Sequence, residues 1–166
     1  MLTKVLKWTS IGTLLAAFLY AQIEALDQVQ NDRKRAWEFY FKNVAGWAAE
    51  HSVRLPVVPS HCDQSYHMFY LLLPSEDDRQ ALIEHLKARL IYSVFHYVPL
   101  HLSQMGRRFG GKEGDCPVTE DVSERLLRLP FYNGFAEEEQ MRVVSALQEF
   151  EAWSTPTDKI QRARGL

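Results

Sequence analysis

The 166-residue sequence contains only two cysteines, Cys62 and Cys116, and they lie far apart in the chain. A disulfide-stabilised domain or a zinc ribbon needs more cysteines at closer spacing, so both architectures are excluded. We expect two free thiols in a reducing, cytoplasmic compartment.

The chain also has little excess of charge of either sign: it contains 19 Lys and Arg residues and 21 Asp and Glu residues, which leaves a net charge of −2. Bulk positive charge therefore gives no reason to expect nucleic acid as a partner. Hydrophobic residues make up 46% of the chain and charged residues 24%, a composition typical of one globular domain.

A long hydrophobic run is missing as well. Lys4 and Lys7 precede an uncharged stretch at residues 8–23, but this stretch contains several polar residues and is shorter than the ~20 apolar residues that span a bilayer. The stretch is interpreted as the start of a buried helix, and no membrane partner is expected. A membrane anchor remains the alternative.

Complete catalytic and metal-binding motifs are absent. Residues 110–112 (GGK) do not fit a phosphate-binding Walker loop, and neither a dinucleotide-binding glycine motif nor a serine nucleophile motif occurs. His96 and His101 cannot share one helical face because Pro99 lies between them. The residues alone therefore predict no catalytic constellation and no metal site.

Apolar residues at helical spacing run through a segment, residues 13–50, that has no proline and only one glycine. We call these residues the apolar stripe: Leu15, Leu19, Ile23, Leu26, Val29, Trp37, Tyr40, Val44 and Trp47. They predict one long helix that must lie against something along its whole length.

The chain beyond residue 54 predicts a small α/β domain with a mixed sheet. Two apolar runs, residues 67–73 and 92–98, are predicted strands, and Ser75 is the expected N-cap of a helix over residues 75–89 between them. Strand, helix and strand in about thirty residues favour parallel pairing of the two strands.

Further elements are expected C-terminal to a glycine-rich loop at residues 105–117. They are a helix over residues 119–128 capped by Thr119, an extended piece at 129–132, a turn at 133–134, a helix over 136–153 and a tail at 154–166.

Four segments in fixed order carry a family resemblance: residues 15–25 (LAAFLYAQIEA), 67–70 (HMFY), 94–101 (VFHYVPLH) and 123–133 (SERLLRLPFYN). Residues 14 to 150 resemble the C-terminal part of the pyridoxal-phosphate-dependent DegT/DnrJ/EryC1/StrS sugar-nucleotide aminotransferases. Within the family, the resemblance is greatest to the enzymes of dTDP-4-amino-4,6-dideoxygalactose synthesis.

The resemblance implies a domain plan. Residues 1–13 are a non-homologous start, 14–50 the long interdomain helix, 51–153 the C-terminal small domain of a fold type I aminotransferase, and 154–166 the tail. The family's large domain carries the lysine that forms the Schiff base with the cofactor. None of that domain is present, and none of the seven lysines of this chain stands in the family's Schiff-base context.

We therefore expect a fragment of an enzyme that would transfer an amino group from glutamate to a dTDP-4-oxo-6-deoxyhexose, inactive alone and without covalently bound cofactor. Upstream of residue 14 the sequence departs from the family pattern. The alternative is a non-catalytic module that uses the 14–50 helix to form a homo-oligomer or to bind a separate large domain.

The resemblance also implies site residues. His96, Tyr97 and His101 match a strand-end motif that faces the family's active-site cleft, where they would hold the phosphates of a nucleotide sugar or close the site. Polar packing at the end of a strand is the alternative role for all three.

Overall fold

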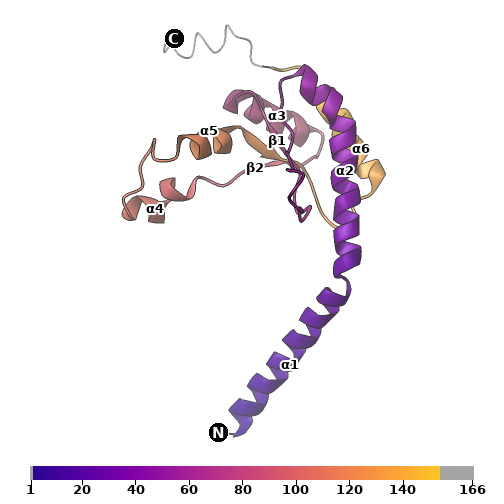
Figure 1. The fold of residues 1–166 in the computed structure, drawn as a ribbon, viewed down its shortest axis with the longest axis vertical. Helices are drawn as coiled ribbons and strands as arrows, with labels where there is room; N and C mark the ends of the chain where they lie inside the picture. The colour runs from indigo at the N-terminus through magenta and orange to yellow at the C-terminus, as the bar shows by residue number, and fades with distance from the viewer. Residues whose placement is uncertain (1, 154–166) are drawn as a thin grey trace.

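Two long helices lead into a small sheet that is flanked by further helices (Figure 1). The computed structural model describes the backbone of residues 2–153 and the side chains of residues 12–153; the predicted tail at 154–166 lies outside the described residues. The elements are α1 (Leu2–Glu24), α2 (Leu26–Glu50), β1 (Tyr70–Leu72), α3 (Glu76–Ala88), β2 (Val94–Phe95), the 3-10 turn η1 (Leu100–Leu102), α4 (Gln104–Arg108), α5 (Pro117–Arg125), β3 (Leu126–Arg128) and α6 (Glu137–Gln148).

The predicted single helix over residues 13–50 is present as two segments, α1 and α2, that meet at an angle (Figure 1). The bend lies at Ala25, whose ψ of −1° departs from the α-helical value near −42°. Backbone hydrogen bonds from Ala25 to Ala21 and from Val29 to Ala25 continue on both sides. Because neither glycine nor proline lies there, no sequence signal predicted the bend.

One face of α2 forms a wall of the hydrophobic core. Its buried residues recur at helical spacing: Ala36, Trp37, Tyr40, Val44, Trp47 and Ala48. All of them except Ala36 pack in one cluster with Phe69, which lies just before β1, Leu127 on β3 and Leu147 on α6. The Tyr40 hydroxyl donates a hydrogen bond to the Pro130 carbonyl oxygen at 3.1 Å, and burial raises the pKa of Tyr40.

The sheet has the order β1-β3-β2, and β3 is antiparallel to both neighbours. β1 and β2 therefore run parallel to each other, as expected, but the prediction that they pair directly is wrong. A strand–helix–strand unit sets the relative direction of its strands without making them neighbours, and here β3 enters between them. Leu127 is fully buried at this central place, opposite Leu71 on one side and Phe95 on the other.

Several element bounds differ from the sequence-based predictions. The predicted strands 67–73 and 92–98 shorten to β1 and β2, while the helix over 136–153 shortens to α6. The third strand is not residues 129–132 but β3, so the predicted helix 119–128 ends earlier than expected.

Capping explains where α3 and α5 begin. Ser75 is confirmed as the N-cap of α3, since its Oγ accepts a hydrogen bond from the Asp78 amide at 3.1 Å. The prediction for Thr119 is wrong: Cys116 is the N-cap of α5, and Pro117 occupies the first turn, where its missing amide proton costs nothing. The loop predicted at 105–117 contains most of the short helix α4. Within the described part of the chain, no helix is long and apolar enough to cross a membrane.

Candidate functional site

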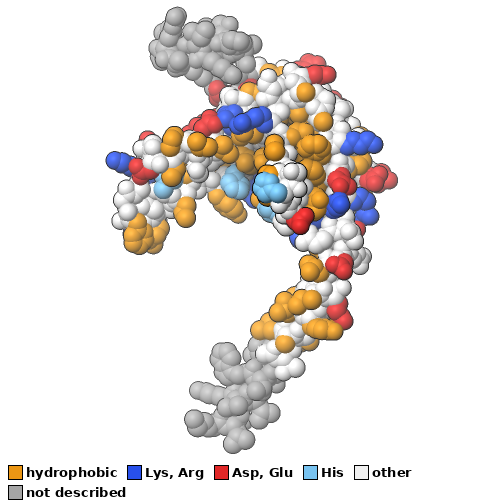
Figure 2. Space-filling view, viewed as in Figure 1, with side chains coloured by type: hydrophobic (Ala, Val, Ile, Leu, Met, Phe, Trp, Pro, Cys, Tyr) orange, Lys and Arg blue, Asp and Glu red, His pale blue; other side chains and the backbone are white. Residues whose placement is uncertain are grey.

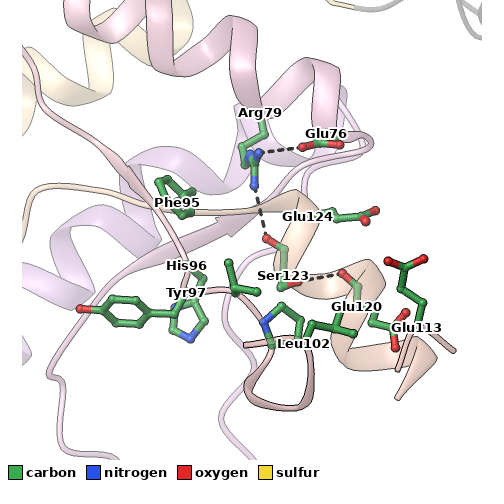
Figure 3. Close-up of a pocket in the computed structure, with 12 residues that line it drawn as sticks. Glu76, Arg79, Phe95, His96, Tyr97, Leu102, Glu113, Glu120, Ser123 and Glu124 are labelled. Atoms are coloured by element: carbon green, nitrogen blue, oxygen red, sulfur yellow. Dashed lines mark hydrogen bonds and ion pairs between the residues drawn. The ribbon is translucent and has the colours of Figure 1, made fainter. Parts of the chain in front are cut away.

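A cleft of about 440 Å³ lies where the end of β2 meets α3 and α5 (Figure 3). The first turn of α3 places Arg79 at its wall. The guanidinium donates to Glu76 Oε1 at 3.1 Å and to the Ser123 carbonyl oxygen at 3.3 Å, and it lies 5.8 Å from the centre of the Phe95 ring. Arg79 therefore ties the start of α3 to α5 and to the edge strand β2.

Carboxylates dominate the lining of this cleft. Four glutamates line it against the single guanidinium of Arg79: Glu76, Glu113, Glu120 and Glu124. Two polar atoms, Nε of Arg79 and Nδ1 of His96, are buried and have no hydrogen-bond partner among the described residues. Two cleft-lining residues thus each carry a buried nitrogen without a hydrogen-bond partner beside an acidic surface.

The structure brings His96 and Tyr97 together in this cleft. Both residues follow β2 directly and line the cleft, and their rings lie 5.9 Å apart. Tyr97 is 73% exposed and extends its phenol away from the glutamates (Figure 3). The Arg128 guanidinium lies 5.3 Å from the centre of the Tyr97 ring.

His101 is placed differently from the other two predicted site residues. It lies in η1, its side chain is 16% exposed, and its Nε2 lies 2.8 Å from Glu120 Oε1. His101 lines a neighbouring, mostly apolar hollow of about 650 Å³ together with Leu100, Met105 and Phe109. Glu120 lines the first cleft and contacts His101, so it connects the two cavities.

Glu120 accepts three more hydrogen bonds, all from backbone amides. The Gly114 amide donates to both carboxylate oxygens at 3.0 Å, and the Cys116 amide donates to Oε1 at 3.2 Å. The Gly114 hydrogen bonds, followed by the one from His101, lower the pKa of the Glu120 carboxyl.

The described lysines do not fit a Schiff-base site for pyridoxal phosphate. Lys34, Lys42, Lys87 and Lys112 are all exposed, and none lines either cavity. A lysine that holds this cofactor must lie inside a site that orients the ring against the substrate. Among the described residues, no group of three or more His, Cys, Asp and Glu residues could hold a metal ion.

Sequence reasoning missed Arg79 and Glu120. Arg79 lies on a helix whose residues gave no sign of a cleft. Glu120 is 19 positions after His101, a spacing that matches neither helical nor strand periodicity. No signal in the sequence pairs Glu120 with His101, because the path of the chain through η1, α4 and the loop before α5 brings these two residues together.

Comparisons with known proteins agree with this arrangement. The sequence profile of the DegT/DnrJ/EryC1/StrS aminotransferase family matches residues 9–148. The chain is similar to UDP-N-acetyl-3-dehydro-alpha-D-glucosamine 3-aminotransferase of Acidithiobacillus ferrooxidans, with 30% identity over 83% of this chain and 35% of that protein. It is also similar to dTDP-3-amino-3,4,6-trideoxy-alpha-D-glucose transaminase of Micromonospora megalomicea, with 26% identity over 81% of this chain and 36% of that protein.

Among solved structures, the fold matches S. venezuelae DesV in complex with a ketimine intermediate, with a TM-score of 0.74 and 28% identity over 84% of this chain and 36% of that chain. The predicted α/β small-domain fold is thereby confirmed. The chain spans between 25% and 37% of the length of three curated relatives and corresponds to their C-terminal part. With most of its length matched by the family profile, the chain belongs to the DegT/DnrJ/EryC1/StrS aminotransferase family.

Proposed function

We propose that this chain supplies the C-terminal small domain of a pyridoxal-phosphate-dependent sugar-nucleotide transaminase. The complete enzyme would transfer an amino group from glutamate to a dTDP-4-oxo-6-deoxyhexose, as in the synthesis of dTDP-4-amino-4,6-dideoxygalactose. The chain would consist of a connecting helical segment (14–50), a small domain (51–153) and a tail (154–166), after a short start (1–13) of which the family profile matches residues 9–13.

The family match over residues 9–148 carries this proposal. We also propose that the chain alone neither binds the cofactor covalently nor transaminates. The exposed positions of Lys34, Lys42, Lys87 and Lys112 support this part of the proposal. The cofactor would supply an electron sink at the substrate carbon. This chain would contribute one wall of the substrate cleft.

We assign His96 and Tyr97 to that wall and His101 to the neighbouring hollow, which Glu120 connects to the cleft. His96 and Tyr97 line the acidic cleft, and an imidazole or phenol there can hydrogen-bond to the substrate. The four glutamates nearby make it unfavourable to bring a diphosphate into the cleft unless positive charge comes from elsewhere. A large domain on a second polypeptide or a preceding segment is the natural source of that charge.

Borohydride reduction tests the cofactor part of the proposal. The purified chain is mixed with pyridoxal phosphate, reduced and measured by intact mass, and amino transfer from glutamate is assayed in parallel. We expect unmodified chain or scattered partial labelling of surface lysines, and no turnover. A stoichiometric adduct on one lysine, or turnover by the chain alone, would overturn it.

A second candidate function, a non-catalytic interaction module, is favoured by the exposed half of the apolar stripe. Leu15, Leu19 and Ile23 on α1 are 63%, 60% and 58% exposed, and Figure 2 shows hydrophobic side chains along the described part of this helix. An exposed apolar surface of this kind usually binds another protein surface. Here a second copy of the chain or a large domain would cover it.

Light scattering after size exclusion tests this second candidate. At micromolar concentration the wild-type chain should form a defined oligomer, and the Leu15→Asp/Leu19→Asp variant should be monomeric. The Val57→Asp variant is the matched control, because Val57 is 85% exposed in the connector after α2. A wild-type chain that stays monomeric would count against self-association.

A further inference from the structure

The segment from η1 to α5, residues 100–120, is organised around one carboxylate. We call this segment the arm; it projects from the sheet in Figure 1. Glu120, four residues after the N-cap of α5, reaches back along the arm. It accepts hydrogen bonds from the amides of Gly114 and Cys116 and from Nε2 of His101. One side chain thus holds both the loop that precedes α5 and the imidazole of η1.

The proton in the contact between His101 and Glu120 can be assigned from chemistry. An ionised carboxylate only accepts hydrogen bonds, and the lowered pKa of Glu120 keeps it ionised at neutral pH. Nε2 of His101, which lies 2.8 Å from Glu120 Oε1, must therefore carry the proton of this hydrogen bond. In the neutral ring, Nδ1 is then the nitrogen with the free lone pair.

Two glycines pack closely against the backbone of His101. A Cβ built at Gly106 would lie 2.6 Å from the His101 carbonyl oxygen, and one built at Gly111 would lie 2.3 Å from it. Both distances are shorter than real Cβ contacts allow. The arm therefore packs against the His101 backbone while Glu120 holds the imidazole, so neither the position nor the orientation of the ring depends on a ligand.

We infer that Glu120 is a positioning residue that fixes His101 in the Nε2–H tautomer and so presents Nδ1 as the nitrogen available to substrate. The assignment of substrate to this site rests on the proposed function; the tautomer and the order of the arm do not. Glu120 has no ligand of its own in this inference and acts through His101.

The fixed tautomer has a consequence for the class of group that His101 recognises. A neutral imidazole with a free Nδ1 lone pair accepts a hydrogen bond from a hydroxyl group. An unprotonated phosphate oxygen has no hydrogen to donate to that lone pair. A hydrogen bond from Nδ1 to phosphate would require the doubly protonated ring. In its neutral form, His101 is therefore a residue for a sugar hydroxyl rather than for the diphosphate.

Ring nitrogen chemical shifts test the tautomer directly. The chain is labelled with ¹⁵N-histidine, and ¹H–¹⁵N correlations of the six imidazoles are recorded at a pH where the rings are neutral, with His101 assigned from its loss in the His101→Gln variant. For His101 we expect Nε2 in the protonated range and Nδ1 in the unprotonated range. Reversed shifts, or the averaged shifts of a free imidazole, would overturn the inference.

Replacing the carboxylate tests its cause. Glu120→Gln keeps the size of the side chain but removes the charge, so the His101 shifts should move towards the average of both tautomers. Hydrogen exchange at the Gly114 and Cys116 amides should accelerate on the order of tenfold, as loss of about one charge-assisted hydrogen bond predicts. Glu120→Asp, which keeps the charge, should retain more of the tautomer bias than Glu120→Gln.

Glu124→Gln is the matched control, since Glu124 lies one turn later on α5 and lines the same cleft. It should leave the His101 shifts and both amides unchanged. An effect of Glu124→Gln equal to that of Glu120→Gln would contradict the specific role of Glu120. All readouts use the chain without cofactor or substrate, so failure of the proposed transaminase function would leave them intact, and the reverse also holds.

Discussion

Tyr20 and Tyr40 lie in the same predicted helix, residues 13–50, yet their surroundings in the structure are opposite. Tyr40 on α2 is fully buried, whereas Tyr20 on α1 is 63% exposed. The difference extends along the stripe: its part from Trp37 to Trp47 on α2 forms a wall of the core, whereas Leu26 at the start of α2 is exposed and the α1 part projects away from the domain (Figure 1). Helical periodicity therefore reports that a face is apolar without reporting which polypeptide covers it.

The tyrosine pair gives the largest expected contrast. Tyr40→Ala should lower the free energy of unfolding by about 3–5 kcal/mol, because it leaves a large cavity and removes the hydrogen bond to Pro130. Tyr20→Ala should change it by less than about 0.5 kcal/mol. Urea denaturation of both variants measures the difference. Equal losses would mean that α1 is covered as α2 is.

The hydrogen bond that joins α2 to α6 gives a smaller contrast. Gln140 is buried, and its Nε2 donates to the Ala36 carbonyl oxygen at 2.8 Å. Gln140→Ala should cost about 1–2 kcal/mol in unfolding free energy. Gln80→Ala removes the exposed hydrogen bond to Glu84 and should cost about 0.3 kcal/mol, so it is the control in the same denaturation series.

Substitutions on the exposed stripe should scarcely change the stability of the monomeric domain. Leu15→Asp and Leu19→Asp should each alter the free energy of unfolding by less than about 0.5 kcal/mol, because both side chains are already in solvent. Urea titrations of the protein, at protein concentrations where no oligomer forms, measure this change in the free energy of unfolding. A loss as large as that of Tyr40→Ala would show that α1 packs on the domain.

Much of the secondary structure was predictable because local chemistry determines it. The Ser75 cap and the α2 stripe are local signals, and both are confirmed. The central strand β3 was missed because Leu126 and Leu127 also suit the end of a helix, and only the tertiary contacts of the sheet select the strand. The bend at Ala25 has no local signal at all.

The candidate site was only partly predictable for the same reason. His96 and Tyr97 are neighbours in sequence, so a single motif placed both of them at the cleft. The contact between His101 and Glu120 depends on the path of the whole arm. Its two tightly packed glycines, Gly106 and Gly111, were visible in the sequence but indicated a loop rather than a fixed contact.

A pH titration compares the arm with the core helix α2 and has the smallest expected effect. The folded-state pKa of Glu120 is lower than its ordinary value of 4.5, so its contribution to stability is present above that value and is lost as the pH falls through the lowered pKa. Protection of the Gly114 and Cys116 amides should fall in this acid range while that of α2 amides remains. If protection of the α2 amides fell together with that of the Gly114 and Cys116 amides, a local role of Glu120 would be contradicted.

Hydrogen exchange along α1 and α2 in the dilute, monomeric chain tests the central comparison most directly. We expect slow exchange in the buried half of α2, around Tyr40 and Val44, and fast exchange in α1 around Leu15 and Leu19, because the first lies in the core and the second has no cover. α1 should become protected only when another polypeptide binds it. Equal, slow exchange in both helices of the monomer would contradict the account.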